Sequence, residues 1–174
     1  MRQYEGYDVK WRIISPEEMT WSANNVIWQS WRRVQEFNDL SKTLLAIGGE
    51  IVVPPSTRAR NGFYEYEMRR VVRRGKFYPG KPVCMRLGKP CQCHTNVSNL
   101  WRDGLPIHIC TGYALSKDGR WRDHTWGVVH TRMPCGDIDI AEPGSVVETT
   151  ESRVCYYGYL MGNIRAGKFV EANR

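Results

Sequence analysis

Residues 107–130, IHICTGYALSKDGRWRDHTWGVVH, contain two runs of strand-forming residues joined by the short segment SKDGR. Both runs, residues 107–115 and 120–130, are rich in β-branched and aromatic residues, which favour strands. The joining segment contains the aspartate and glycine that are typical of hairpin turns. These residues therefore predict an antiparallel pair of strands.

The segments on either side of this hairpin extend the prediction. Residues 93–104, CHTNVSNLWRDG, predict a short helix that ends at Gly104, and residues 145–150 and 154–160 predict two further strands. Helices followed by a meander of strands are typical of an α+β fold. We expect N-terminal helices followed by a small antiparallel sheet, which packs on the helix that starts at Cys93.

The N-terminal half predicts helices. Ser15 is a candidate N-cap, Pro16 suits the first helical position, and Glu18 completes a capping box. Apolar residues then recur near the helical period until Gly48 and Gly49 end the predicted helix.

Three shorter segments connect this helix to the second half of the chain. Residues 50–55, EIVVPP, predict a short strand, and residues 62–75 predict a second helix. Residues 76–90 contain three prolines and two glycines and are interpreted as a loop.

Length and charge limit the classes of protein. The chain has 174 residues, which fits a single domain, residues 1–174, with a helical, basic part at residues 1–80 and a core at residues 81–174. Its net charge is +7, with 16 basic and 9 acidic residues in positions 1–92 and nine of each in positions 93–174. The surplus favours an acidic partner for the N-terminal half, although solvation alone is an alternative. Because the sequence has neither an apolar signal segment nor a run of 18 apolar residues, we expect a cytoplasmic protein that does not contact the membrane.

A basic segment within this half suggests nucleic acid or another acidic partner. Four arginines lie three and four positions apart, so that a helix would cluster them: Arg69, Arg70, Arg73 and Arg74. Phe77 and Tyr78 follow and offer rings for stacking. A solvated helix face is the alternative, since the sequence matches no nucleic-acid-binding motif.

Six cysteines are many for this length, and without a signal segment we expect thiols rather than disulfides. Structural zinc is an alternative, because six candidate ligands fall within 27 residues: Cys84, Cys91, Cys93, His94, His108 and Cys110. Their spacing does not form the paired C-x2-C motifs of zinc sites, so we expect neither a metal nor another cofactor.

Cys93 has the position of a reactive thiol. The N-terminal end of a helix favours a thiolate, which is the nucleophilic form. His124 lies in one predicted strand and Glu148 in the next clear strand, so neighbouring antiparallel strands can bring a base and an orienting acid together. The alternatives are a buried structural cysteine, a core histidine and a solvent-facing glutamate. Trp101, Trp121 and Trp126 are interpreted as core residues.

The order CHTN, TGYAL, DHTWGV and GSVVETT resembles the transglutaminase-like, papain-related cysteine enzymes, particularly small bacterial or phage-type members, over residues 84–160. The resemblance implies that Cys93 is the nucleophile, His124 the base and Glu148 the orienting acid, with Asn96 and Trp126 matching supporting positions. The sequence departs from the family in having glutamate in place of aspartate, and threonine in place of alanine at position 125 and of proline at position 149. Asp139 lies in a longer segment before Glu148 and is an alternative acid.

The expected function is acyl transfer by a cysteine nucleophile on an amide or ester carbonyl, through a thioester intermediate. Water as the acceptor gives a hydrolase, and an amine gives an acyltransferase. A protein or peptide substrate is expected. The alternative is a basic protein that binds nucleic acid or protein without catalysis, with an inactive or zinc-stabilised version of the same fold.

Overall fold

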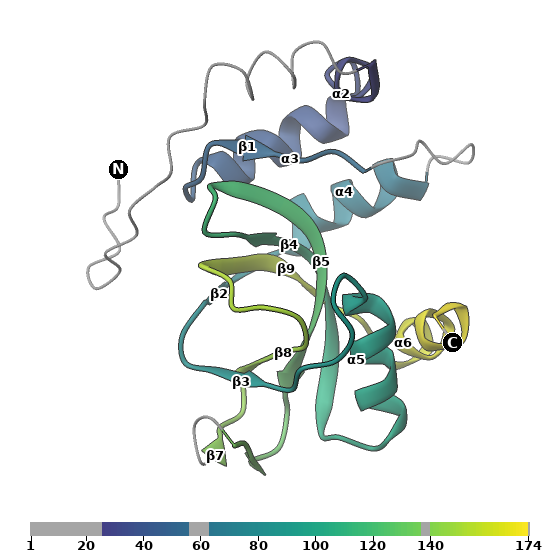
Figure 1. Cartoon of the computed structure of the whole chain (residues 1–174). Helices are drawn as coiled ribbons and strands as arrows, with labels where there is room; N and C mark the ends of the chain where they lie inside the picture. Colours follow the sequence, from purple (N-terminus) through teal and green to yellow (C-terminus); the bar gives the residue numbers. More distant parts are fainter. Residues whose placement is uncertain (1–25, 56–62, 137–139, 174) are drawn as a thin grey trace.

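The structure, a computed structural model, describes residues 26–55, 63–136 and 140–173 and has an α+β fold (Figure 1). The helices in these ranges are α2 (Val26–Trp31), α3 (Gln35–Leu45), α4 (Phe63–Arg74), α5 (Cys93–Arg102) and α6 (Asn163–Ala172). The strands are β1 (Ile51–Val52), β2 (Lys76–Pro79), β3 (Val83–Met85), β4 (Ile107–Leu115), β5 (Arg120–Val129), β6 (Met133–Pro134), β7 (Ile140–Ala141), β8 (Val146–Glu148) and β9 (Cys155–Leu160). Within the described ranges, no helix has the length and apolar character needed to cross a membrane.

The predicted hairpin is confirmed as the centre of a seven-stranded sheet. Strands β4 and β5 pair from Ile107 opposite Val129 to Leu115 opposite Trp121. The strand order is β2-β9-β4-β5-β8-β3, and β1 pairs with the beginning of β5. The two strands predicted at residues 145–150 and 154–160 correspond to β8 and β9.

The sheet is mixed, so the prediction of a purely antiparallel sheet is wrong. Strand β1 runs parallel to β5, and β3 runs parallel to β8. Parallel pairs need long connections, and here the intervening helices and strands supply them. The prediction also missed α6, which lies beside α5 (Figure 1).

The N-terminal predictions are partly corrected. Ser15, Pro16 and Glu18 lie outside the described residues, and the rest of the predicted long helix is interrupted between α2 and α3. The interruption buries Val34 beside Trp31. The indole Nε1 of Trp31 donates a hydrogen bond to the Pro55 carbonyl, at 3.2 Å, and this bond ties α2 to the segment after β1.

The segment interpreted as a loop, residues 76–90, contains two strands, β2 and β3. Both lie at the edges of the sheet, and Pro79 closes β2. Proline is tolerated at an edge strand because the missing N–H need not join a ladder. The prolines and glycines of this segment therefore lie at the end of β2, between the two strands and after β3, and they do not indicate a continuous loop.

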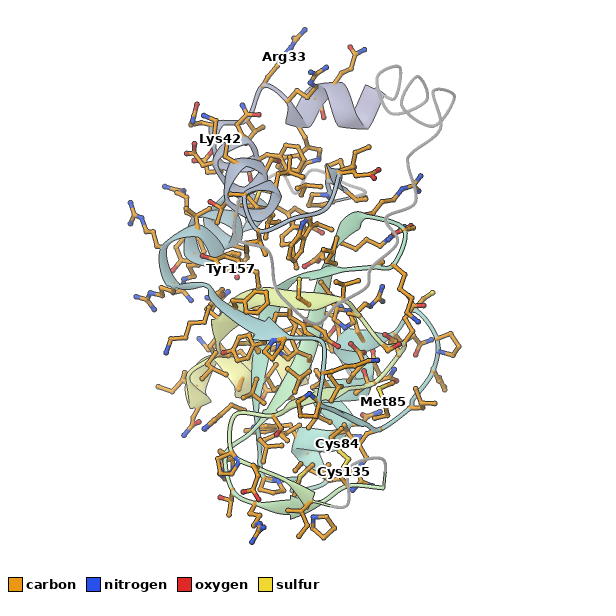
Figure 2. All side chains as sticks on the ribbon, turned by 90° about the vertical axis from the view of Figure 1, so that its left-hand side faces the viewer. Arg33, Lys42, Cys84, Met85, Cys135 and Tyr157 are labelled. Carbon is orange, nitrogen blue, oxygen red and sulfur yellow. A yellow bond between two sulfur atoms is a disulfide. The ribbon has the colours of Figure 1, made fainter. Side chains whose placement is uncertain are left out.

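Two of the cysteines form a disulfide, which contradicts the expectation of free thiols only. Cys84 in β3 is bonded to Cys135, at the end of the molecule opposite Arg33 and Lys42 (Figure 2). The bond closes 51 residues and belongs to a core cluster with Val147. Spacing along the sequence did not reveal this pair. Cys84 is placed by the pairing of β3 with β8, and Cys135 directly follows β6, so the two cysteines meet only in the folded chain. Disulfides persist mainly in oxidising compartments, and the cytoplasmic location stays a prediction.

Candidate active site

The loop before α5 is fixed by Asn96, one of the supporting residues that the sequence suggested. Its amide Nδ2 donates to the carbonyl of Lys89 at 2.8 Å and to that of Thr149 at 3.4 Å, and its Oδ1 accepts from the Lys89 N–H at 3.1 Å. A Cβ at Gly88 would lie 2.4 Å from Cγ of Asn96, so glycine leaves the space that this side chain fills. Asn96 therefore connects the start of α5 to the end of β8.

Cys93 is the first residue of α5, as the sequence predicted. The first turn of the helix contains no acidic residue, and the thiol is partly exposed. Burial, the largest effect, would raise the pKa of the thiol, but hydrogen bonds to His124 and His94 and the charges on both rings outweigh it. The pKa of Cys93 is thus lowered from its ordinary value of 9.0 to about 5. The thiolate is therefore the dominant form at neutral pH.

The edge of β5 explains how the thiol reaches His124. On the side away from β4, β5 pairs with β1 at Arg120 and Trp121 and with β8 at Gly127 and Val128. In the described chain, no strand pairs with residues 122–126 on that side. Helix α5 packs against β5, and the hydrogen bond between Cys93 and His124 brings the start of the helix to this stretch of strand.

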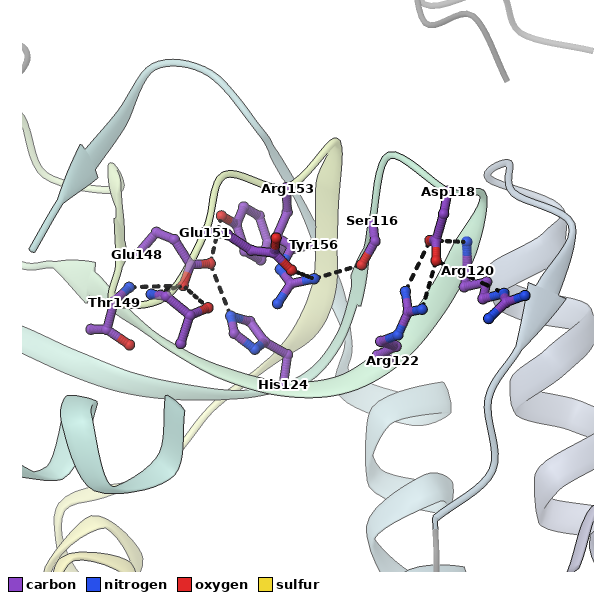
Figure 3. A network of polar contacts seen from close by, with 11 residues as sticks. Ser116, Asp118, Arg120, Arg122, His124, Glu148, Thr149, Glu151, Arg153 and Tyr156 are labelled. Atoms are coloured by element: carbon purple, nitrogen blue, oxygen red, sulfur yellow. Dashed lines mark hydrogen bonds and ion pairs between the residues drawn. The ribbon is translucent and has the colours of Figure 1, made fainter. Parts of the chain in front are cut away.

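His124 is buried and is held by Glu148. Its Nε2 lies 2.9 Å from Oε2 of the carboxylate (Figure 3), which leaves Nδ1 as the nitrogen for the thiol. Burial would lower the pKa of the imidazole, but the hydrogen bonds with Cys93 and Glu148 outweigh it and raise the pKa from 6.5 to about 9. Cys93 and His124 therefore form a thiolate–imidazolium pair at neutral pH.

Glu148 is fully buried, and the alternative of a solvent-facing strand residue is wrong. Its Oε1 accepts from the N–H groups of Thr149 and Thr150 and from the Thr150 hydroxyl, at 2.8, 2.8 and 2.9 Å. Its Oε2 accepts from the Tyr156 hydroxyl at 2.9 Å as well as from His124 (Figure 3). Burial would raise the pKa of the carboxyl, but these bonds, that of His124 first, lower it from 4.5 to about 2. The carboxylate stays charged and fixes the imidazole.

Trp126 supports the histidine. It is fully buried, its ring centroid lies 6.2 Å from that of His124, and the two rings are 16° from parallel. Because both residues lie on the same face of β5, two positions apart, the indole restricts the rotation of the imidazole. Trp121 is also buried, as predicted for a core residue, and Trp101 is partly buried against the core.

Two residues on the other side of the thiol were not predicted in this role. Nδ1 of His94 lies 3.5 Å from Sγ of Cys93, and Asp123 is an exposed residue whose charge acts on His94. Burial lowers the pKa of His94, but the hydrogen bond with Cys93 and the charge of Asp123 leave it raised. Tyr156 and Thr150 were missed as well. A local signal in the sequence could have indicated Thr150. The backbone N–H groups of the two residues that follow an acidic residue can donate to its carboxylate, and a threonine there adds a hydroxyl.

The four arginines of the predicted cluster lie away from this site. Asp139 lies outside the described residues. Arg69 forms an ion pair with Glu36 at 3.5 Å, whereas Arg73 and Arg74 are exposed at the end of α4. The arginine cluster is therefore divided, and Arg70 alone faces another cavity, described below.

The candidate zinc ligands are dispersed. Cys84 is bonded to Cys135, and Cys110 is buried in a different cluster from Cys84. The ring of His108 lies 4.9 Å from that of His130 between centroids, tilted by 39°. In the part of the chain that the structure describes, no three cysteine, histidine or acidic side chains are grouped so that they could hold a metal ion.

A scan against protein-family models found no match, and searches among curated proteins and among solved structures gave no significant match. The resemblance to transglutaminase-like cysteine enzymes stays a prediction. The functional conclusion therefore depends on the geometry of Cys93, His124 and Glu148 and on the chemistry that these three side chains permit.

Proposed function

We propose that this chain is a cysteine-nucleophile acyl-transfer enzyme that acts on amide or ester carbonyl groups of a protein or peptide. The observation that carries the proposal is the connected set of a thiol at a helix start, a buried imidazole and a fully satisfied carboxylate. A nucleophile, its base and the group that orients the base are the three parts that such catalysis needs. The resemblance over residues 84–160 assigns the same roles to the same three residues.

The first half of the reaction forms a thioester. Sγ of Cys93 attacks the carbonyl carbon and forms a C–S bond, and the electron pair of the C=O bond moves to oxygen. Backbone N–H groups at the start of α5, including that of Cys93, have no acceptor within the helix and can stabilise this oxyanion. The tetrahedral intermediate then expels the amine or alcohol, which takes its proton from His124.

The second half regenerates the thiolate. Water or an amine attacks the thioester carbon, and His124 accepts the proton of this nucleophile. The C–S bond breaks and leaves the Cys93 thiolate next to the protonated imidazole. Throughout both halves Glu148 keeps its charge, because its pKa is held at about 2, and it stabilises the imidazolium.

Acylation of the thiol by a small activated ester tests the proposal. After incubation with p-nitrophenyl acetate at pH 7 and an acid quench, we expect one acetyl group per chain, on the peptide that contains Cys93. Release of p-nitrophenolate should continue after the first turnover, because the thioester is hydrolysed. Cys93→Ala should remove both signals, whereas Cys91→Ala, two positions away, should keep them.

The non-enzymatic alternative predicts a different result in the same assay. An inert thiol would acquire no more acetyl than the exposed Cys91, and p-nitrophenolate release would be equal in Cys93→Ala and the unaltered chain. Such an outcome would leave a binding protein with a structural copy of the three residues.

A further inference from the structure

A cavity of about 630 Å³ begins at the two residues on the far side of the thiol, His94 and Asp123. His94 is shared between the cavity and the nucleophile, because its Nδ1 lies 3.5 Å from Sγ of Cys93. The cavity therefore adjoins the nucleophile, and His94 lies between them. Its volume falls within the range of ligand-binding pockets, about 300–1,000 Å³.

The walls of the cavity are largely apolar and aromatic. They come from α4, β4 and α6 and include Tyr64, Tyr66, Met68, Val71, Tyr113 and Phe169. Phe169 also packs on His94, with 5.5 Å between the ring centroids. A large apolar group that adjoins the reacting carbonyl would therefore be enclosed by rings and aliphatic chains, and its burial would contribute to binding.

A second, shallower depression adjoins the cavity and is cationic. Arg165 and Lys168 line both hollows, and Arg70 completes the charged part of the depression. Arg165 is paired with Glu67, which also accepts from the Tyr159 hydroxyl. Among the described residues that line the depression none is acidic. Three cations and one paired carboxylate therefore leave a positive surplus.

Arg70 is held in a fixed position in this depression. Its guanidinium donates to the Tyr66 hydroxyl at 2.5 Å and lies 4.6 Å from the centroid of the same ring. It is also the member of the predicted arginine cluster that faces a hollow of the surface. A guanidinium that is positioned by aromatic rings retains N–H groups for a carboxylate.

We propose that the aromatic cavity and the cationic depression together recognise an acidic peptide, an inference that rests on the proposed acyl-transfer function. The side chain next to the scissile carbonyl is large and apolar and occupies the cavity, and aspartate or glutamate residues further along the peptide lie at Arg70, Arg165 and Lys168. A peptide is favoured over nucleic acid because the cavity adjoins a nucleophile for a carbonyl carbon, with His94 shared between them, and because its walls are largely apolar.

Peptide benzyl thioesters test both parts of this site. Four substrates are compared, with alanine or phenylalanine at the carbonyl and an N-terminal extension of two aspartates or two lysines. We expect kcat/KM to be about 10–200-fold higher for phenylalanine than for alanine, the range for added apolar groups in a pocket. The aspartate extension should be preferred over the lysine extension, mainly through KM, and salt should weaken this preference.

Variants separate the two hollows. Lys168→Glu changes an exposed residue and should reverse the aspartate preference while the phenylalanine preference persists, whereas Phe169→Ala should reduce the phenylalanine preference. Arg33→Glu is the matched charge control, since Arg33 is exposed and lines neither hollow. It lies at the end of the molecule opposite the disulfide (Figure 2). This control should leave all four values unchanged.

The outcomes distinguish this proposal from the proposed function. If Cys93 is acylated by all four thioesters at equal rates, the enzyme remains and the recognition site is refuted. If none of them acylates Cys93, and p-nitrophenyl acetate does not either, the function itself fails. If a single-stranded oligonucleotide binds to the depression, loses affinity in Lys168→Glu and leaves the peptide preferences intact, the depression is a nucleic-acid site and the acidic-peptide assignment is wrong.

Discussion

Asp123 and His124 are neighbours on β5, and the two faces of the strand give them opposite environments. His124 lies among buried groups, where Glu148, Tyr156 and Trp126 hold it in one orientation. Asp123 is exposed and lines a cavity beside His94. The thiol of Cys93 interacts with both sides. We call the face of β5 that carries His124 the fixed face and the face that carries Asp123 the open face. In our proposal, the fixed face sets the reactivity of the thiol, and the open face is available for the substrate.

Replacement of the buried histidine should have the largest effect. His124→Ala removes the base and the main partner of the thiolate, so we expect acylation to slow by about 10²–10⁴-fold, the usual contribution of general acid–base catalysis. The rate of acetyl transfer to Cys93 at pH 7 is the measurement. His130→Ala, a change of an exposed histidine just beyond the same strand, is the control and should keep the original rate. If His124→Ala and His130→Ala are acetylated at equal rates, the face of β5 that carries His124 does not set the reactivity of the thiol.

Glu148→Gln tests whether the fixed face depends on a charge. The amide has nearly the same shape, but it cannot accept all five hydrogen bonds and leaves the imidazolium without its counter-ion. We expect a loss of about 3–5 kcal/mol in the free energy of unfolding, as for other broken buried pairs, and a higher pKa of Cys93. Urea denaturation and alkylation kinetics measure the two effects. Glu151→Gln changes an exposed partner of Arg153 and should alter neither.

Removal of the disulfide tests how local the support of Glu148 is. In the pairing of β3 with β8, Cys84 lies opposite Val147, and the next residue, Met85, lies opposite Glu148. The double change Cys84→Ala and Cys135→Ala should lower the free energy of unfolding by about 2–4 kcal/mol. The pKa of Cys93 should stay low, because the hydrogen bonds to Glu148 come from His124, residues 149–150 and Tyr156. A rise in that pKa without unfolding would mean that the disulfide, rather than these bonds, positions the carboxylate.

His94→Ala should have the smallest effect on the thiol. His94 contributes a hydrogen bond and a charge to the thiolate, and the acid that acts on its ring is the exposed Asp123. We expect the pKa of Cys93 to rise by about one unit, the value of a single hydrogen bond, and by less than in His124→Ala. Alkylation at a series of pH values compares the two variants. A larger shift in His94→Ala would reverse the assignment of the two faces.

The sequence predicted the parts of the site that depend on local patterns. Helix α5 begins at Cys93 because the segment 93–104 has helical character and follows a proline, and the strands with His124 and Glu148 were visible from their composition. Their pairing with β3 and β1, and hence the mixed sheet, depends on contacts between distant segments. The link between Cys84 and Cys135 and the hydrogen bond from Tyr156 to Glu148 are of the same kind, since no local pattern encodes them.

The open face was less predictable than the fixed one. His94 was considered only as a metal ligand, and α6, which supplies Arg165, Lys168 and Phe169 to the two hollows, was missed. The spacing of the four arginines indicated a shared surface, but Glu36 pairs with Arg69, and Arg70 alone packs on Tyr66. The composition of a cavity depends on which elements meet in space, and a single sequence does not contain that information in a local form.

The pH dependence of Cys93 alkylation tests the central claim most directly. Iodoacetamide is added at a series of pH values, and the peptide that contains Cys93 is quantified by mass spectrometry. Because the pKa of this thiol is lowered to about 5, the thiolate forms as the pH rises through 5, and because the pKa of His124 is about 9, the imidazolium persists until the pH passes 9. We predict a rise in rate with a midpoint near pH 5, a plateau up to about pH 9, and loss of this plateau in His124→Ala. A single midpoint near the ordinary thiol pKa of 9.0, the same in both proteins, would contradict the account.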